Sequence, residues 1–239
     1  MAMICFENMP STKLEKLIPR FHLKGIIFDL DGTLTNTLDQ HIEAFARVFA
    51  RNGYSVDRDK IKANMGRRPF DIVRDLIFDG HPDEELSEEQ VSDLYRMAQE
   101  KIDEFTSLIP EHPPRMPGVP DVLAKAKHLG LKLAVVSSTT YKNVKIILDR
   151  IDVFKYLDAL VTGEDVKIGK PHPEAFLKGA EKLGFPKENL IVIGDSVHDI
   201  GSAKQGGLRI IAVATGKHSV AELKEKHPEM VLPDLLSFM

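Results

Sequence analysis

The chain has 239 residues, of which 43% are hydrophobic and 28% are charged, with a formal net charge of −4. This length suits one large domain, or one core with a smaller inserted domain, and it can bury a sizeable core without covalent staples. The slightly acidic balance argues against nucleic acid as a main partner. Cys5 is the single cysteine, so an internal disulfide is impossible, which fits a reducing cytoplasm.

The N-terminal segment predicts neither a membrane anchor nor a secretion signal. No segment has the roughly 18 uninterrupted apolar residues of a membrane helix. The first ten residues, MAMICFENMP, lack a charged start and a long apolar stretch, so we expect a cytoplasmic protein. Thr12 and Glu15 have the spacing of a capping box, which predicts a short helix ending near Pro19. We interpret residues 1–22 as an N-terminal extension that packs on the core.

Five short apolar runs end in Gly, Ser, Thr or Asp, as buried strands do when they stop at a polar loop. In chain order they are KGIIF (24–28), LKLAVVSS (131–138), ALVTGED (159–165), NLIVIGDS (189–196) and LRIIAVATG (208–216). Helical patterns lie between them, over 121–129, 143–151, 173–183 and 200–205. This alternation predicts an α/β fold, a Rossmann-like parallel sheet with helices on both faces. Ligands of such sheets bind beyond the carboxyl ends of the strands.

The alternation stops between residues 36 and 116, where every pattern is helical. The helical stretches cover 38–52, 57–65, 70–78 and 87–105, and a proline-rich segment, PEHPPRMPGVP, follows them. We therefore expect an all-helical module at 36–116, inserted into a discontinuous core made of 23–35 and 117–239.

Acidic side chains follow two of the predicted strands. Asp29 and Asp31 end the first strand and would repel each other by roughly 4 kcal/mol at close range, so a cation or a shared proton must offset the repulsion. Asp195 and Asp199, in GDSVHD, follow a later strand and point to the same edge. Carboxylate oxygens of this kind suit Mg²⁺. The alternatives are a polar Asp-Gly turn after Asp29, and an Asp199 that merely caps a helix starting near Ile200.

Two further polar residues belong to this predicted edge. Lys170, in GKPHPEAF, precedes a proline and is therefore held outside a helix, where its ammonium can attract a phosphate. Ser137 ends a strand, and its hydroxyl can donate to a phosphoryl oxygen. Taken singly, Lys170 is equally compatible with an ordinary surface lysine, and Ser137 with a serine that only caps the end of the strand.

The four motifs, DxDGT, a strand-ending Ser, KP and GDxxxD, occur in this order on nearly the whole chain from Lys24 onward. Together they resemble the signature of the haloacid dehalogenase-like hydrolase superfamily. The helical insert resembles the cap of its subgroup of phosphoglycolate phosphatase-like enzymes and β-phosphoglucomutase.

The resemblance implies a role for each matching residue. Asp29 would be the nucleophile and a magnesium ligand, and Asp31 the general acid and base, with its backbone carbonyl on the metal. Ser137 and Lys170 would bind the phosphoryl group. Asp195 would bind Mg²⁺, with Asp199 supporting it directly or through water. Thr33 would stabilise the loop that carries Asp29 and Asp31. A dehalogenase does not need the second acid, so Asp31 favours phosphate chemistry.

The insert supplies candidate substrate-binding residues. Thr37 and His41 have a spacing that resembles the β-phosphoglucomutase pattern, in which a histidine helps control cap closure, although His41 can equally lie on a polar helix face. Arg67 and Arg68, in MGRRPF, are candidates to grip an anionic substrate, and the sequence does not choose between them. Ser138 is a further candidate. His172 and His198 lie inside motifs, and we interpret both as spacers.

We predict a Mg²⁺-dependent phosphatase acting on a small phosphorylated metabolite such as phosphoglycolate or a sugar phosphate, as a monomer or small homo-oligomer. Two alternatives remain, a phosphomutase and a catalytically silent binding protein. The mutases usually carry an acid where this chain has Gly194, which favours the hydrolase.

Overall fold

A computed structural model describes residues 12–239. Cys5 and the N-terminal residues used to judge a secretion signal lie outside the described part. Between residues 12 and 239, none of the helices combines the length and the apolar character needed to cross a membrane.

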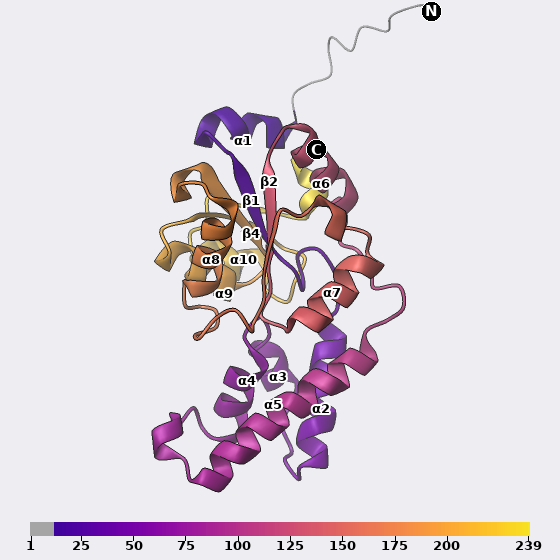
Figure 1. The fold of residues 1–239 in the computed structure, drawn as a ribbon, viewed down its shortest axis with the longest axis vertical. Coiled ribbons are helices and arrows are strands. Elements are labelled where there is room, and N and C mark those ends of the chain that lie inside the picture. Colours follow the sequence, from indigo (N-terminus) through magenta and orange to yellow (C-terminus); the bar gives the residue numbers. More distant parts are fainter. Residues whose placement is uncertain (1–11) are drawn as a thin grey trace, which may run out of the picture.

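A six-stranded sheet forms the centre of the molecule, with the order β3-β2-β1-β4-β5-β6 and every neighbouring pair parallel (Figure 1). The strands are β1 (Gly25–Asp29), β2 (Lys132–Val136), β3 (Ala159–Val161), β4 (Leu190–Gly194), β5 (Arg209–Val213) and β6 (Met230–Leu232). The parallel α/β sheet expected from the sequence is confirmed. The edge strand β6 was not predicted, because three apolar residues carry too little periodicity to stand out.

Helices cover both faces of this sheet. They are α1 (Lys13–Phe21), α6 (Val119–His128), α7 (Tyr141–Arg150), α8 (Glu174–Leu183), α9 (Val197–Gln205) and α10 (Val220–Glu225). Short 3₁₀ turns are η1 (Asp83–Glu85), η2 (Phe154–Tyr156), η3 (Lys187–Asn189) and η4 (Leu235–Phe238).

The expected helices α6, α7 and α8 begin or end one or two residues from their expected bounds, and α1 and α9 differ for reasons that their caps and burial explain. The predicted capping box of Thr12 and Glu15 is present, but α1 continues beyond Pro19 to Phe21. Pro19 lies on the exposed side, so the apolar stripe of the helix can continue past it. Helix α9 starts three residues earlier than expected, because Ser196 caps it and Asp199 completes a capping box from inside the helix.

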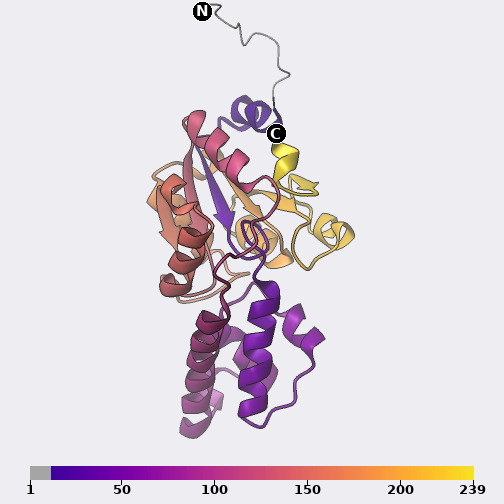
Figure 2. The same cartoon turned by 90° about the vertical axis from the view of Figure 1, so that its right-hand side faces the viewer.

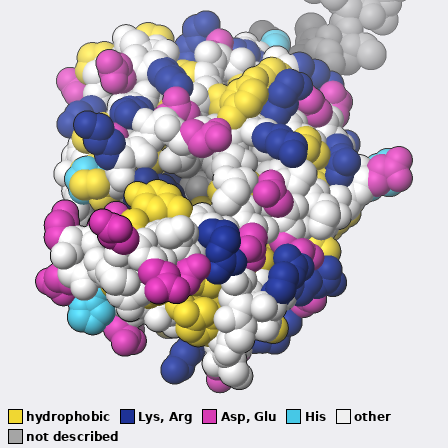
Figure 3. Space-filling view, turned by 60° about the horizontal axis from the view of Figure 1, so that its bottom comes forward, with side chains coloured by type: hydrophobic (Ala, Val, Ile, Leu, Met, Phe, Trp, Pro, Cys, Tyr) yellow, Lys and Arg dark blue, Asp and Glu magenta, His cyan; other side chains and the backbone are white. Residues whose placement is uncertain are grey.

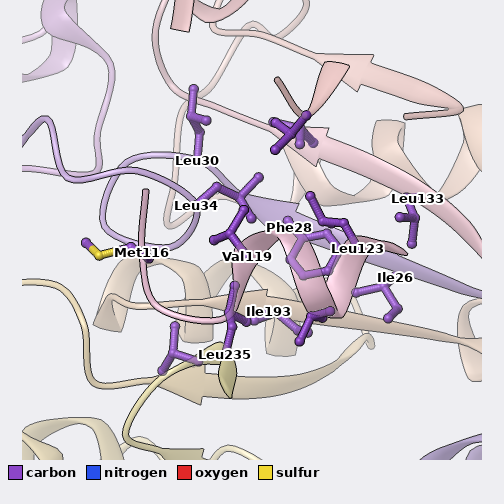
Figure 4. Close-up of a cluster of buried hydrophobic side chains, with 14 of the residues drawn as sticks. Ile26, Phe28, Leu30, Leu34, Met116, Val119, Leu123, Leu133, Ile193 and Leu235 are labelled. Carbon is purple, nitrogen blue, oxygen red and sulfur yellow. The ribbon is translucent and has the colours of Figure 1, made fainter. Parts of the chain in front are cut away.

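Strand residues alternate between two hydrophobic clusters, one on each face of the sheet. Ile26 and Phe28 of β1 belong to the cluster under α6, and Ile27 belongs to the cluster under α8 and α9. Figure 4 shows part of the first cluster, in which side chains of β1, β2 and β4 pack against α6 (Ile26, Phe28, Leu133, Ile193, Val119 and Leu123). Burial on both faces explains the near-continuous apolar runs that predicted the strands.

The segment between β1 and α6 forms a separate group of helices beyond the carboxyl ends of the strands (Figures 1 and 2). They are α2 (Leu38–Arg51), α3 (Arg58–Ala63), α4 (Pro69–Ile77) and α5 (Glu88–Leu108). This helical unit has a hydrophobic cluster of its own, centred on Phe45 and Phe49 of α2. Where the chain enters and leaves it, Thr35 donates to the Pro114 carbonyl and Met116 donates to the Leu34 carbonyl.

One lysine of the sheet domain reaches across to the helical unit. Lys217, in the loop after β5, donates hydrogen bonds to three backbone carbonyls at the end of α3 (Lys62, Ala63 and Met65, at 2.7 to 3.0 Å). Cations at a helix C-terminus stabilise the unpaired carbonyls there. Lys217 therefore helps to hold the helical unit over the edge of the sheet.

Shortening one buried side chain of α1 tests whether this helix is part of the hydrophobic core. Leu14 is fully buried in the same cluster as Phe28. We expect Leu14→Ala to lower the free energy of unfolding by about 2–5 kcal/mol, since it removes a buried side chain and leaves a cavity. Urea unfolding measures this change. The exposed neighbour Lys16 is the control, and Lys16→Ala should stay within about 0.5 kcal/mol of the parent. Equal stability of Leu14→Ala and the parent would show that α1 is dispensable.

Candidate active site

Three carboxylates from distant parts of the chain meet at the carboxyl edge of the sheet. Asp29 ends β1, Asp195 follows β4, and Asp199 lies in the first turn of α9. Strands β1 and β4 are neighbours in register, so their ends lie side by side. One oxygen of each carboxylate lies within 4.8 Å of the others, and this is the one such acidic group found in residues 12–239.

Lys170 joins two of these acids. Its Nζ lies 2.5 Å from Asp29 Oδ1 and 2.8 Å from Asp199 Oδ1, and the side chain is fully buried. Burial lowers the pKa of Lys170, but the two carboxylates outweigh burial and raise its pKa above the ordinary value. Lys170 is therefore a fixed positive charge beside Asp29.

Two of these three carboxylates, Asp29 and Asp195, resist ionisation, whereas Lys170 and Ser196 outweigh burial and lower the pKa of Asp199. Burial raises the pKa of Asp29 to about 7, with Lys170 opposing the rise and Asp199 adding to it. Burial, followed by repulsion from Asp29 and Asp199, raises the pKa of Asp195 well above its usual range. Three carboxylates and one ammonium leave a charge of −2 when all are ionised. A divalent cation is the simplest group that balances it.

The loops around Asp195 hold its carboxylate in place. Thr33 Oγ1 donates a hydrogen bond of 2.9 Å to Asp195 Oδ1. A Cβ atom at Gly32 or Gly216 would collide with the same carboxylate, and Gly32 also has a positive φ of 99°. Only glycine fits at these two approaches. Thr33 is fully buried, and its hydrogen bond fixes the orientation of the Asp195 carboxylate.

Asp199 contacts both its own helix and Lys170, and of these two contacts only the helix cap was among the alternatives that the sequence left open. Its Oδ2 accepts from the backbone and hydroxyl of Ser196, which closes the capping box of α9. Its Oδ1 accepts from Lys170. The acid both caps the helix and anchors the lysine.

The carboxylate of Asp31 points away from this group, toward α2. It accepts a hydrogen bond from Thr37, and His41 Nε2 lies 3.4 Å from it, which is too long for a well-formed hydrogen bond. Burial raises the pKa of Asp31, but His41, Thr37 and Lys101 outweigh burial and lower it. The two aspartates of the DxD motif therefore have separate surroundings.

Lys101 of α5 extends this arrangement and was missed by sequence reasoning. Its Nζ lies 2.7 Å from His41 Nδ1, and the rings of Phe45 and Phe105 lie beneath it at 4.7 Å each. Burial lowers the pKa of Lys101 to about 7. The signal was present in the sequence, because Lys101 occupies the apolar stripe of α5 (Leu94, Met97, Ala98 and Phe105) where a lysine is unexpected.

A small cavity of about 40 Å³ lies between these groups and the helical unit. Asp29, Asp31, His41, Arg67 and Ser138 are among the residues that line it. Arg67 is held there by Asn64 and Asp75, at 2.8 and 2.5 Å.

Arg68 faces a neighbouring groove and is engaged by the Asp71 carboxylate and the Val166 carbonyl. Ser137 does not line the cavity, and its hydroxyl accepts from the Thr139 amide. Among the expected spacers, His172 accepts from the Glu174 amide, and His198 Nε2 is buried with no partner in residues 12–239.

The site fits an oxygen-bound divalent cation. Asp29 and Asp195, with Asp199 behind them, offer the hard oxygen ligands that Mg²⁺ prefers. Burial and mutual repulsion raise the pKa values of Asp29 and Asp195, and a cation between them would counter both effects. A bound ion would neutralise charge next to Asp29, and Lys170 would do the same from the other side.

Comparison with known proteins places this arrangement in a family. The sequence model described as haloacid dehalogenase-like hydrolase matches residues 26–213. A probable phosphatase from Dickeya dadantii, IndB, is 31% identical over 214 residues, covering 87% of this chain and 88% of the relative. A phosphorylated carbohydrates phosphatase from Thermotoga maritima is 31% identical over 192 residues, covering 79% and 84%.

Solved structures agree with this placement. β-Phosphoglucomutase from Clostridium difficile superposes with a TM-score of 0.79 at 25% identity, covering 91% of this chain and 93% of that chain. The motif residues, the fold and these relatives lead to one conclusion: the chain belongs to the haloacid dehalogenase-like hydrolase family.

Proposed function

We propose that this protein is a Mg²⁺-dependent phosphatase that hydrolyses small phosphate monoesters through a phosphorylated Asp29. Membership of the family makes it a haloacid dehalogenase-like phosphatase, and the proposal adds the metal, the intermediate and the substrate class. The observation that carries it is the pairing of Asp29 with Lys170 inside a group of buried carboxylates. Relatives named as phosphatases, one of them acting on phosphorylated carbohydrates, support it.

The first half of the reaction needs a nucleophile and an acid. Asp29 attacks phosphorus while the bond to the leaving oxygen breaks, and the proton of Asp31 goes to that oxygen. An anionic nucleophile approaches a phosphate dianion here, and Lys170 compensates part of that charge. A divalent cation held by Asp29 and Asp195 would supply the remaining electrostatic stabilisation.

The second half releases phosphate. Asp31 takes a proton from water, the water oxygen attacks phosphorus, and the bond to Asp29 breaks to give inorganic phosphate. The lowered pKa of Asp31 in the free protein suits this base role. An arriving phosphate dianion repels the carboxylate and raises its pKa, which suits the acid role. Thr37 and His41, with Lys101 behind them, position Asp31 from the helical unit.

We propose that the helical unit, residues 36–116, acts as a cap that closes over the site. Its own hydrophobic cluster lets it move as a body, and Asp31 contacts this unit by accepting a hydrogen bond from Thr37, the N-cap residue of α2. Closure at Arg67 and Gly66 would exclude water from the phosphoryl group. Lys217 and Ser138, which donate to carbonyls of the unit, favour the closed arrangement.

A phosphomutase is the second candidate, since β-phosphoglucomutase shares the fold and the Thr37–His41 spacing resembles the pattern of that enzyme family. Gly194 argues against it. A Cβ atom at this position would lie 2.7 Å from Asp199 Cβ, so the acid that mutases carry here would displace Asp199. A silent binding protein is disfavoured because the nucleophile, second acid, lysine and metal-binding acids are all assembled.

Metal removal and the loss of the nucleophile test the central proposal. We expect purified protein with Mg²⁺ to release phosphate from an aryl phosphate, and EDTA to stop it reversibly. Asp29→Asn should lower kcat by more than about a thousandfold, because amide nitrogen and oxygen are poor nucleophiles. The exposed Asp121→Asn is the matched control and should keep full activity. Undiminished turnover by Asp29→Asn would remove the proposed nucleophile.

The reaction product distinguishes a phosphatase, which releases inorganic phosphate, from a phosphomutase, which transfers the phosphoryl group back to the sugar. We expect ³¹P NMR of a glucose 1-phosphate reaction, primed with glucose 1,6-bisphosphate, to show inorganic phosphate growing without accumulation of glucose 6-phosphate. Accumulation of glucose 6-phosphate without net phosphate release would assign the protein as a mutase.

Buried Lys101 predicts a pH dependence of stability. Its pKa is about 7 in the folded protein against an ordinary 10.5, so between these values the unfolded chain binds the extra proton. The free energy of unfolding therefore rises with pH in this window, by up to about 1.4 kcal/mol per pH unit from this residue.

Lys101→Met removes this contribution. Denaturant unfolding at pH 7.5 and 8.5 should show a smaller rise in stability for the variant than for the parent, by about 1 kcal/mol. Lys62→Met, on the exposed surface of α3, should leave the parent slope unchanged. Parallel slopes for Lys101→Met and the parent would mean that Lys101 stays charged when folded.

A further inference from the structure

A second cavity lies next to the small one that Asp29 lines. The inner cavity has about 40 Å³, which holds little more than a phosphoryl group. A groove of about 340 Å³ adjoins it and shares three wall residues with it, Pro69, Ser138 and Thr139. A substrate whose phosphate sits at Asp29 can place its remaining atoms in this groove.

One wall of the groove is aromatic. Tyr95 of α5 is 55% exposed, although it lies on the same helix as the buried stripe. Phe70 of α4 packs against it with ring centroids 4.5 Å apart, and the Arg74 guanidinium lies 4.6 Å from the centroid of the Phe70 ring. Tyr95 is therefore held by Phe70 while part of its ring stays exposed to a ligand in the groove.

The opposite wall offers hydroxyl groups without partners. Thr139 and Thr140 line the groove, and the Oγ1 atoms of both are buried with no hydrogen-bond partner in the described residues 12–239. Thr140 is the N-cap residue of α7, yet its hydroxyl does not cap the helix. Buried hydroxyls left unpaired cost free energy, so a ligand that pairs them gains it.

The groove carries little net charge. Arg68 is paired twice with Asp71, and the other charged residues of the lining are Glu164, whose carboxylate accepts from the Tyr141 amide, and the exposed Lys167, one of each sign. A leaving group with a second phosphate or a carboxylate would meet Glu164 without a free buried cation. Figure 3 shows basic and acidic side chains interspersed on this end of the molecule, with no field of one sign.

The cavity on the other side of Asp29 has different chemistry. It is lined by Asp31, Asp39, Asp195 and Asp199, together with Lys62 and Lys217. These charged groups suit a hydrated cation and the entry of water. An uncharged ring would lose contacts there that Tyr95 provides in the groove.

We propose that the groove between α4, α5 and the loop after β2 binds the leaving group of the substrate, and that this group is an uncharged hydroxylated ring. A hexose or cyclitol monophosphate has this chemistry: its ring face packs on Tyr95 and its hydroxyls pair with Thr139 and Thr140. The proposal rests on the phosphatase function above and selects ring monophosphates over phosphoglycolate.

Kinetics with a matched set of esters tests this assignment. The set contains hexose and cyclitol monophosphates, phosphoglycolate and acetyl phosphate, with kcat/KM measured for each. We expect the best ring ester to exceed phosphoglycolate. Tyr95→Ala should lower the ratio of kcat/KM for that ester to kcat/KM for acetyl phosphate by about 3- to 10-fold, the size of an aromatic contact. Tyr95→Phe should restore it.

Thr140→Val tests the hydroxyl wall with nearly unchanged volume. It should lower the same ratio by about tenfold, since the substrate hydroxyl loses its partner, while Thr140→Ser keeps the ratio. Thermal unfolding of Thr140→Val should match the parent, because no cap bond is lost. Tyr54→Ala, at another exposed tyrosine of the helical unit, is the control and should keep the parent ratio.

The outcomes separate the two proposals. If acetyl phosphate is hydrolysed but the ratio survives both Tyr95→Ala and Thr140→Val, or phosphoglycolate is the preferred ester, the groove assignment is wrong and the phosphatase stands. If no ester releases phosphate with Mg²⁺ present, the phosphatase proposal fails, and the groove assignment fails with it.

Discussion

The concentration of negative charge at the carboxyl edge of the sheet is the constraint on which the rest of the site depends. Asp29, Asp195 and Asp199 are buried within reach of one another, and Lys170 alone does not balance them. Such a group is costly unless a cation and a substrate complete it. The site is prepared for an incoming phosphate by this excess of buried negative charge, which a cation must neutralise, and not by any single residue.

The fold produces this concentration through strand order. Because β1 lies between β2 and β4, the loops that carry the DxD motif, the serines and the last acids must emerge side by side. Lys170 reaches the same place from the loop before α8, over the ring of Phe176. The glycines at 32 and 216 let two backbone segments approach Asp195 closely. The helical unit then covers an edge that the sheet alone leaves open.

Sequence reasoning reached the sheet and its polar edge because both have local signals. Apolar runs ending at Asp29 and Asp195 identified the strands, and parallel topology brought their ends together. The family resemblance gave Asp29 and Asp31 different roles, but the strand pattern alone did not show that their carboxylates face different partners, because side-chain direction after a strand depends on the loop. Sequence reasoning also did not reach Lys101, whose role depends on a contact with His41 across 60 residues. The strand β6 and the choice between Arg67 and Arg68 likewise needed three-dimensional packing.

Both arginines show why the substrate is harder to derive than the chemistry. Their charges are already engaged by Asp75 and Asp71, so neither is a free anion-binding group, and the walls of the groove carry more information about the leaving group. The phosphoryl site is defined by groups that must be there for the reaction. The leaving-group site is defined by shape, by the Tyr95 ring and by unpaired threonine hydroxyls.

The most direct measurement of the central claim is a crystal structure of the protein soaked with Mn²⁺, which prefers the same oxygen ligands as Mg²⁺ and is located by its anomalous signal. We expect one ion bound by carboxylate oxygens of Asp29 and Asp195, with Lys170 beside it. An ion located elsewhere, or no ion at this edge under saturating Mn²⁺, would contradict a cation site built from these acids.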